Sequence, residues 1–309
     1  MSTHAQIEPI SDTSRLLSGG YQSKRRKKEA VLAYILLLPA MLFVVGILGY
    51  GVVSAFITSL HRVHALYIDQ PFVGFRNYLN LFQNANFINS FQRSLIFVLS
   101  SVALGTVLAL IAALSLYRLV RFKGASQAVS LIPYFVSGIS AAVAWRFMFA
   151  GNASLINMVT EMIGAQSRSW LGHETRAMIV VILANVWKIA PFSILIILSG
   201  LQSIDTDLFD AADIDGATGA KKFRYVTLPL IAPMMSVSII WLNFASFNMF
   251  DVIIALTGGG PGRATDLMAV HLYRLAFERL DFSGASAVMI VLLFINVAVS
   301  VISLKLSKV

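Results

Sequence analysis

Cysteine is absent from this sequence, and charged residues are scarce. Only 13% of the 309 residues are Asp, Glu, Lys or Arg, whereas 57% are hydrophobic and the mean hydropathy is +0.77. A soluble domain carries about a quarter charged residues, so the deficit indicates that lipid surrounds most of the chain. The absence of cysteine excludes disulfides, thiolate metal sites and cysteine nucleophiles.

Motifs of catalysis and phosphate binding are also missing. No G-x-x-x-x-G-K-[ST] loop is present, so we do not expect this chain to hydrolyse ATP itself or to bind a cofactor. No H-E-x-x-H or G-x-S-x-G motif indicates a membrane enzyme, and no metal site is expected from the five histidines. The net charge of +9 is scattered over short loops, which argues against a nucleic-acid partner.

Six apolar stretches are long enough to cross the hydrocarbon core, which takes about 20 residues of helix. They are Ala30 to Leu60, Ser94 to Tyr117, Gly124 to Trp145, about Ala177 to Gly200, Tyr225 to Phe250, and Phe282 to Leu304. The sequence therefore predicts an all-α integral membrane protein with six transmembrane helices. We expect a transmembrane domain over residues 29–309, preceded by a basic, disordered tail over residues 1–28.

The distribution of Lys and Arg predicts the orientation of the helices. If the N-terminus is cytoplasmic, 14 of these residues lie on the inner side and 9 on the outer side, with Lys188 left inside the fourth span. Both termini are therefore expected in the cytoplasm. The sequence shows no internal repeat, and so lacks the two-halves signature of many secondary transporters.

The second cytoplasmic loop, residues 201–229, has the pattern of two short helices around a turn. Asp205 or Thr206 can cap the first helix, and Gly216 falls where the backbone must turn through a positive φ. Pro229 is expected to open the fifth span. Taken alone, the pattern is also compatible with a solvated linker between two spans.

Three elements of this loop, Asp210-Ala211-Ala212, Gly216 and Val226-x-Leu228-Pro229, resemble the EAA loop of importer permeases of the ATP-binding-cassette (ABC) class. That family has Glu-Ala-Ala, three residues, Gly, nine residues, and Ile-x-Leu-Pro. This chain keeps the spacing, with Asp for Glu and Val for Ile. The resemblance implies a type I ABC importer permease fold and a coupling helix, residues 205–216, that docks on a separate ATPase subunit. The docking residues it implies are Leu208, Phe209, Asp210, Ala211, Ala212 and Gly216.

Other stretches resemble the carbohydrate-uptake branch of these permeases, of the maltose or glycerol-phosphate type. They are Phe72 to Tyr78, Leu131 to Tyr134, Asn185 to Phe192, and Leu256 to Thr265. The resemblance implies a bacterial inner-membrane subunit for a sugar or related polyhydroxylated solute. Its expected partners are a second permease subunit, two ATPase subunits or domains that bind ATP and Mg²⁺, and a periplasmic or lipid-anchored solute-binding protein.

Polar residues at membrane depth are candidates for the translocation pathway, because a charge in mid-helix is costly. Lys188 is such a charge, and its cation is compatible with an anionic solute, for instance a glycerol phosphate or a sulfonated sugar. It could equally pair with a carboxylate or carbonyl of a neighbouring helix. The other candidates are Asn185, Asn243, Phe247 and Asn248.

The last outer loop contains the run from Gly258 to Gly262, in which Gly259, Gly260 and Pro261 could contact the solute-binding protein. An ordinary turn between two helices would explain the same run. The alternatives for the whole chain are an ABC importer permease for another solute class or, less favoured, an ATP-independent secondary transporter.

Overall fold

The computed structural model describes residues 32, 34–64, 66, 68–119, 121–151, 154–164 and 166–306. The expected basic tail, residues 1–28, lies outside the described residues. The chain divides between Ala55 and Phe56 into two units, each described here by itself. Among the described residues every regular element is helical, and the only β-type pairing is two isolated bridges.

The first span is a single helix, Tyr34–Ser59, that includes the π-helical turn η1 (Val44–Gly49) and α2 (Tyr50–Ser59). Its most apolar stretch has no buried residue. A helix that is hydrophobic all round needs lipid or protein on every side.

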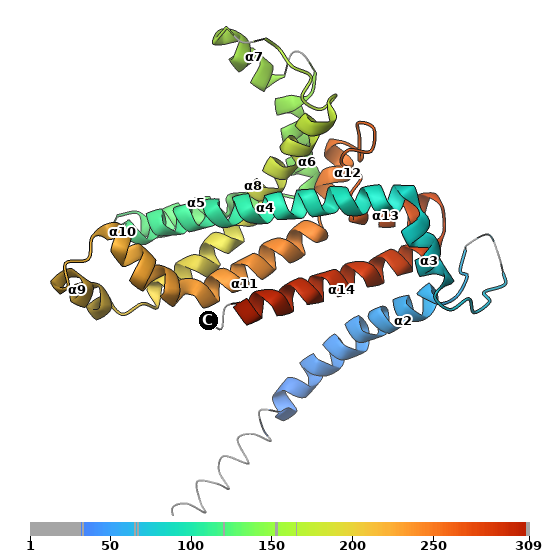
Figure 1. Cartoon of the computed structure of the whole chain (residues 1–309), viewed down its shortest axis with the longest axis horizontal. Coiled ribbons are helices and arrows are strands. Elements are labelled where there is room, and N and C mark those ends of the chain that lie inside the picture. The colour runs from blue at the N-terminus through green and yellow to red at the C-terminus, as the bar shows by residue number, and fades with distance from the viewer. Residues whose placement is uncertain are drawn as a thin grey trace, which may run out of the picture. The chain divides into compact units, whose positions relative to one another are not determined.

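The second unit contains all the remaining helices (Figure 1). They are α3 (Arg76–Gln83), α4 (Ala85–Arg118), α5 (Lys123–Phe135), α6 (Gly138–Phe149), α7 (Leu155–Met162), α8 (Glu174–Gln202), α9 (Thr206–Ile214), α10 (Gly219–Lys222), η2 (Phe223–Thr227), α11 (Leu228–Phe247), α12 (Asp251–Leu256), α13 (Met268–Tyr273), η3 (Arg274–Glu278) and α14 (Phe282–Leu306). Five helices of the described residues are long and apolar enough to span a membrane, and the bent pair α5–α6 makes a sixth.

Small residues on α4 allow the closest helix packing. Ser101, Gly105, Ala109 and Ala113 recur every fourth residue and are all buried, so they form one stripe along the helix. A methyl group on Gly105 would lie 3.1 Å from a side-chain carbon of Leu242 on α11. Small residues at such positions let helices approach in lipid, where dispersion and packing replace the hydrophobic effect.

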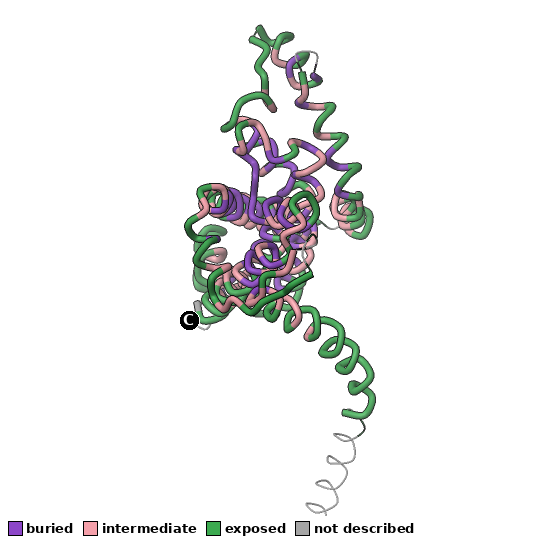
Figure 2. The backbone as a smooth tube through the Cα atoms, turned by 90° about the vertical axis from the view of Figure 1, so that its right-hand side faces the viewer, coloured by how far each residue is buried: buried purple, intermediate pink, exposed green. Residues whose placement is uncertain are grey.

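Buried residues are concentrated in the middle of the second unit, while long stretches of its helices stay exposed (Figure 2). Large apolar side chains point outward, including Phe147, which is 74% exposed, and Phe294, which is 67% exposed. An apolar exterior of this extent is expected where lipid or partner subunits cover the protein.

The third span differs from the prediction of one continuous helix from Gly124 to Trp145. The structure breaks it between α5 and α6, which are bent by 92°. Pro133 lacks the N–H of a normal helical bond, and the backbone becomes extended at Val136. The fifth span also differs, because the helical chain already begins at Gly219 rather than at Tyr225.

Candidate coupling helix and translocation site

The helix α9 has a defined beginning and end. The side chain of Asp205 accepts a hydrogen bond from the Asp207 N–H at 3.1 Å, as expected of an N-cap. At the other end the Gly216 N–H donates to the Asp213 carbonyl, and the Ala217 N–H donates to the Ala212 carbonyl at 2.9 Å. Gly216 has a φ of +68°, so the chain leaves the helix through the left-handed turn that the sequence predicts.

The two faces of α9 have different surroundings. Ala212 is only 8% exposed, and Phe209 packs against an apolar cluster of side chains from α4, α8 and α11. Asp210 and Ala211 are exposed, and Leu208 is 45% exposed. The inner face therefore attaches α9 to its own chain, whereas the outer face is free in this subunit.

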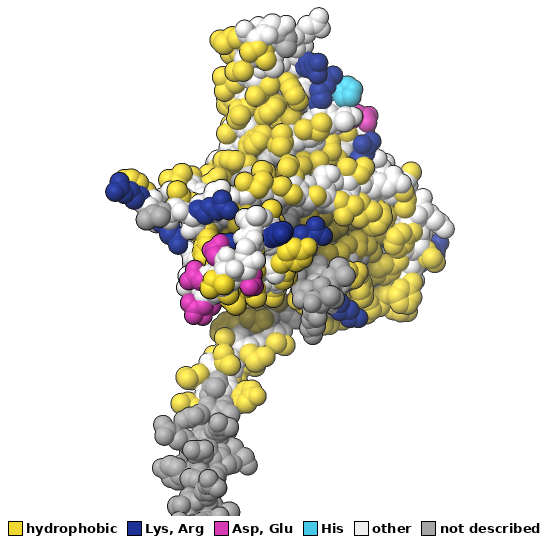
Figure 3. Space-filling model, turned by 60° about the vertical axis from the view of Figure 1, so that its left-hand side comes forward, with side chains coloured by type: hydrophobic (Ala, Val, Ile, Leu, Met, Phe, Trp, Pro, Cys, Tyr) yellow, Lys and Arg dark blue, Asp and Glu magenta, His cyan; other side chains and the backbone are white. Residues whose placement is uncertain are grey.

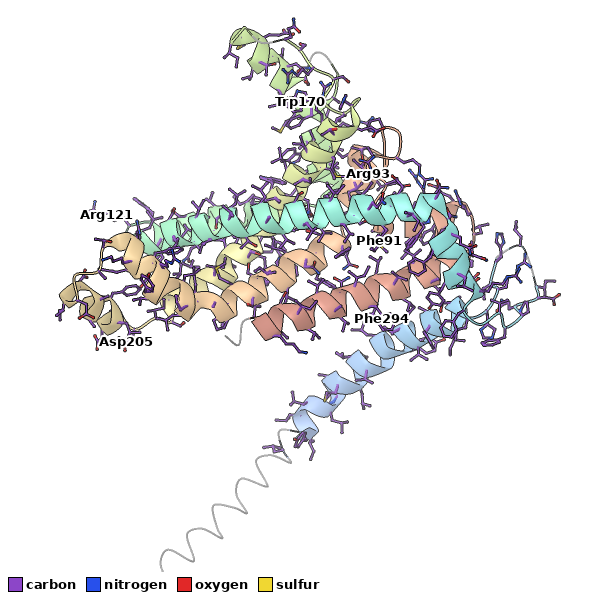
Figure 4. The ribbon with its side chains drawn as sticks, viewed as in Figure 1. Phe91, Arg93, Arg121, Trp170, Asp205 and Phe294 are labelled. Carbon is purple, nitrogen blue, oxygen red and sulfur yellow. The ribbon has the colours of Figure 1, made fainter. Side chains whose placement is uncertain are left out.

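The helix α9 is rich in acidic side chains and has basic side chains nearby. It carries five acidic side chains within itself and at its caps, and Asp213 forms an ion pair with Lys222 of α10. Figure 3, in which this end of the molecule comes forward, shows acidic side chains with basic side chains beside them. Figure 4 places Asp205 and Arg121 at the same end of the second unit. Ile214, beside the turn, is 87% exposed and adds an apolar contact point.

Three of the five predicted pathway residues lie inside the chain. Asn185 donates to the Ser246 hydroxyl at 3.0 Å, and Asn243 donates to the side-chain oxygen of Asn296 at 3.4 Å. Phe247 is only 4% exposed. These contacts join α8 to α11 and α11 to α14, so the structure gives these residues packing partners rather than an open surface.

Asn248 differs from them because it is exposed, with its amide donating to the Phe244 carbonyl at 2.8 Å. It ends a stripe of exposed side chains on one face of α11 that includes Leu230, Met234, Val237 and Phe244. This face is open to lipid or to a second subunit.

Lys188 lies at the centre of α8, 14 residues from Glu174 and 14 from Gln202. Its ammonium group donates to the Val136 carbonyl at 2.6 Å, at the end of α5. The cation is thus engaged with a carbonyl of a neighbouring helix, which was one of the two alternatives. The helix α8 continues through Pro191.

Asp251, the first residue of α12, lies at the other side of the same break. A methyl group on Gly138 would collide with its carboxylate, so the carboxylate lies against the first residue of α6. Asp251, which directly follows the predicted fifth span, was not singled out from the sequence. The signal that could have found it is a lone carboxylate at the edge of an apolar run.

An aromatic cluster next to the break was also missed. Tyr134 stacks on Phe192 with ring centroids 5.4 Å apart, and Phe192 lies 4.6 Å from Trp241. The Trp241 indole donates to the Ile189 carbonyl at 3.3 Å. Three spans, α5, α8 and α11, meet at this cluster. Its rings come from distant parts of the sequence, so no local pattern predicts it.

The predicted contact loop, residues 258–262, is held by its own polar groups. Thr265 donates to the Gly260 carbonyl at 2.8 Å and shares a hydrogen bond with Thr257 at 2.7 Å. Gly259 is buried, whereas Gly260 and Pro261 are half-buried. Gly259 has a φ of +86°, which disfavours any other residue, and a methyl group there would lie 2.9 Å from the Arg274 guanidinium, which would have to shift.

A fully buried carboxylate organises the segment after this loop. Asp266 accepts hydrogen bonds from Arg263 at 2.8 and 2.5 Å and pairs with Arg274 at 3.2 Å. Its second oxygen has no partner among the described residues. Arg93 of α4, labelled in Figure 4, pairs with Glu174 at 3.3 Å and ties the start of α8 to the same end of the unit.

His271 of α13 is buried beside this ion pair and lines a cavity of about 210 Å³ together with Arg263 and Arg274. Burial lowers the pKa of His271 to about 4, against the opposing effect of Asp266 and with smaller lowering effects of the nearby arginines. The imidazole is therefore neutral at physiological pH. No group of three or more potential metal ligands occurs among the residues that the structure describes.

Multiple helices long and apolar enough to span a membrane, with a capped, exposed helix between two of them, define the class as a multi-pass membrane protein. Residues 83–308 match the binding-protein-dependent transport system inner membrane component family, and the chain belongs to it. The protein is therefore a multi-pass inner-membrane subunit of an ABC importer.

Two named relatives cover most of the chain. It is 35% identical to the trehalose/maltose transport system permease protein MalF of Thermococcus litoralis, over 93% of this chain and 97% of that protein. It is 32% identical to the sn-glycerol-3-phosphate transport system permease protein UgpA of Yersinia pestis, over 89% of this chain and 93% of that one. Resemblance to the carbohydrate-uptake branch is thereby confirmed.

A solved structure has the same fold. It is a chain of a bacterial ABC transporter involved in the import of the acidic polysaccharide alginate, with a TM-score of 0.76 and 22% identity. The match covers 93% of this chain and 98% of that chain. The predicted all-α importer permease fold is confirmed. The prediction did not include the break in the third span.

Proposed function

We propose that this permease subunit imports a sugar or a related polyhydroxylated solute. The observation that carries the proposal is the similarity, along almost the whole chain, to relatives named for trehalose/maltose and for glycerol 3-phosphate. Both kinds of solute present two or more hydroxyl groups, which amide and hydroxyl side chains recognise. The balance of Lys and Arg supports cytoplasmic termini, with α9 on the cytoplasmic side.

In this proposal α9 docks on a separate ATPase subunit, which binds and hydrolyses ATP with Mg²⁺. Its exposed face, Leu208, Asp210, Ala211 and Ile214, makes the contact. Ala212 and Phe209, also predicted as docking residues, pack against their own chain and would hold α9 in position for this contact. Gly216 sets the direction in which the chain leaves the helix.

The translocation pathway runs between this subunit and a second permease. The exposed stripe of α11 that ends at Asn248 supports this placement, because a single subunit leaves it uncovered. Asn185, Asn243 and Phe247 support the wall of the pathway from behind. Lys188 is engaged with Val136, so its cation does not by itself argue for an anionic solute.

The loop from Gly258 to Gly262 faces a solute-binding protein on the outer side. Its hydrogen bonds give it a fixed shape. Gly260 and Pro261 are more accessible than the buried Gly259, and the exposed Gly258 and Gly262 lie on either side of them. A preformed loop loses little conformational entropy on docking, which favours binding.

Co-purification in mild detergent tests the docking of α9. We expect the natural subunit to bring down an ATPase and a second permease. Ala211→Trp places a bulky side chain on the exposed face of α9 and should lose the ATPase but keep the second permease. Ala220→Trp, at another exposed alanine on α10, is the matched control and should keep both.

If the natural subunit purifies intact without any ATPase, the importer function is wrong and an ATP-independent transporter becomes the better account. If Ala211→Trp keeps the ATPase, the importer function stands but the contact surface is not the outer face of α9.

A further inference from the structure

The third span is interrupted near its centre. Val136 lies 13 residues after the start of α5 at Lys123 and 13 before the end of α6 at Phe149. A broken helix leaves carbonyl groups free at the end of its first half and N–H groups free at the start of its second half. In a membrane these groups need partners, because no bulk water is available.

A cation lies at the first of these ends. The Lys188 ammonium donates to the Val136 carbonyl at 2.6 Å, where α5 stops. The carboxyl end of a helix carries a partial negative charge, so an ammonium group is stabilised there. The Lys188 ammonium thus donates a hydrogen bond to a free carbonyl and also offsets the partial negative charge at the end of α5.

An anion lies at the second end. The Asp251 carboxylate packs against Gly138, the first residue of α6, so closely that only hydrogen fits on that α-carbon. Ser137, which precedes α6, makes no side-chain capping bond of its own. The amino end of a helix carries a partial positive charge, and Asp251 supplies the opposite charge from another element.

We propose that Lys188 and Asp251 are positioning residues that hold the third span broken by placing a cation on the end of α5 and an anion on the start of α6. Neither residue takes part in an ion pair among the described residues, so each charge is available to its helix end. Tyr134 lies two residues before Val136, so the break also fixes the aromatic cluster with Phe192 and Trp241.

The two charges come from the spans on either side of the loop 201–229. Lys188 belongs to α8, which leads into α9, and Asp251 follows α11, which leaves the same loop. A movement of α9 would shift both charges relative to the break. This consequence rests on the proposed function, whereas the role of the charges at the break does not.

Spin labels can report the break directly, because the chain has no cysteine. Ile132→Cys and Phe147→Cys put labels on exposed positions of α5 and α6. In the assembled importer, with reactive cysteines removed from its partners, we expect one narrow distance distribution. Lys188→Met and Asp251→Asn should each broaden or shift it, while Lys188→Arg, which keeps the cation, should not.

Transport provides the second readout. Uptake per ATP hydrolysed should fall by about twofold to thirtyfold in Lys188→Met and Asp251→Asn, the range of a charge at a helix end, and should be largely retained in Lys188→Arg. An unchanged label distance in both charge-removing variants overturns the proposal, whichever solute is carried. Absence of ATP-driven uptake in the natural complex instead contradicts the proposed function. In that case the label distances alone test the role of Lys188 and Asp251 at the break.

A milder variant covers the case in which the charge-removing chains fail to assemble. Gly138→Ala keeps every charge but adds a methyl group where the Asp251 carboxylate lies. The carboxylate must move away from α6, so the label distances should broaden in the same sense. A natural distance distribution in Gly138→Ala contradicts the proposal.

Discussion

Gly216 is the residue whose chemistry most directly controls the end of α9. Its φ of +68° is easy for glycine, and a methyl group added there would have nothing within 4 Å, so only backbone conformation is at stake. Gly216→Ala should destabilise the turn by about 1 kcal/mol. We expect weaker ATPase retention in co-purification, with Gly216→Asn closer to the natural chain because asparagine tolerates the left-handed region.

Gly219 offers a matched control for this prediction. It also has open space around it, but its φ is not positive, and it begins α10. Gly219→Ala should leave ATPase retention unchanged. Equal losses in the two alanine variants would mean that the left-handed turn is not what the coupling helix requires.

His271 makes stability depend on pH. Its pKa is lowered to about 4 in the folded chain by burial, compared with 6.5 for the ordinary group. Below pH 6.5 the unfolded chain binds a proton that the folded chain does not, so stability falls as the pH drops and levels off below about 4. The full loss from this group is about 3 kcal/mol.

Thermal unfolding in detergent at about pH 7.5 and pH 5 measures this effect. The natural chain should lose more stability on acidification than His271→Gln, which has no titrating ring. Parallel losses in the two chains would show that other groups cause the acid sensitivity.

At the scale of the helices, the small-residue stripe of α4 determines how closely α8 and α11 pack against α4. Ala109→Leu adds three carbons at a fully buried position and should destabilise the chain by about 1–3 kcal/mol through overpacking. Ala103→Leu, at an exposed position of the same helix, is the control and should have little effect. Loss of folded protein on detergent heating is the measurement, and equal behaviour of both variants would contradict the packing.

The segment after the last outer loop depends on its buried ion pair. Asp266→Ala leaves Arg263 and Arg274 without their shared carboxylate and should cost about 3 kcal/mol. Glu278→Ala removes an exposed partner 4.0 Å from Arg274 and should cost less than about 1 kcal/mol. Limited proteolysis of this segment should increase in the first variant only, and resistance in both would contradict the role of Asp266.

Local features were predicted well from the sequence because they depend on neighbouring residues. The cap at Asp205, the turn at Gly216 and the apolar lengths of the spans all follow from short-range chemistry. The break in the third span was not predicted, because Lys188 and Asp251 reach it from distant parts of the chain. Pro133 and Gly138 were the only local signals, and such residues also occur in unbroken transmembrane helices.

At the scale of the whole molecule, a single subunit leaves much apolar surface and the outer face of α9 uncovered. The sequence indicated membrane class, importer family and solute branch through composition and ordered motifs. The sequence predicted the pathway residues less well. Asn185 and Asn243 form hydrogen bonds with other helices and Phe247 is buried, and these contacts depend on how the helices pack.

The most direct test of the central claim is solute accumulation in proteoliposomes that contain the purified complex, with Mg²⁺-ATP inside and the solute-binding protein outside. Labelled maltose, trehalose and glycerol 3-phosphate are compared, each with and without ATP. We predict accumulation of a polyhydroxylated solute that requires both ATP and the binding protein. Accumulation driven by an ion gradient alone, without ATP, would contradict the importer account.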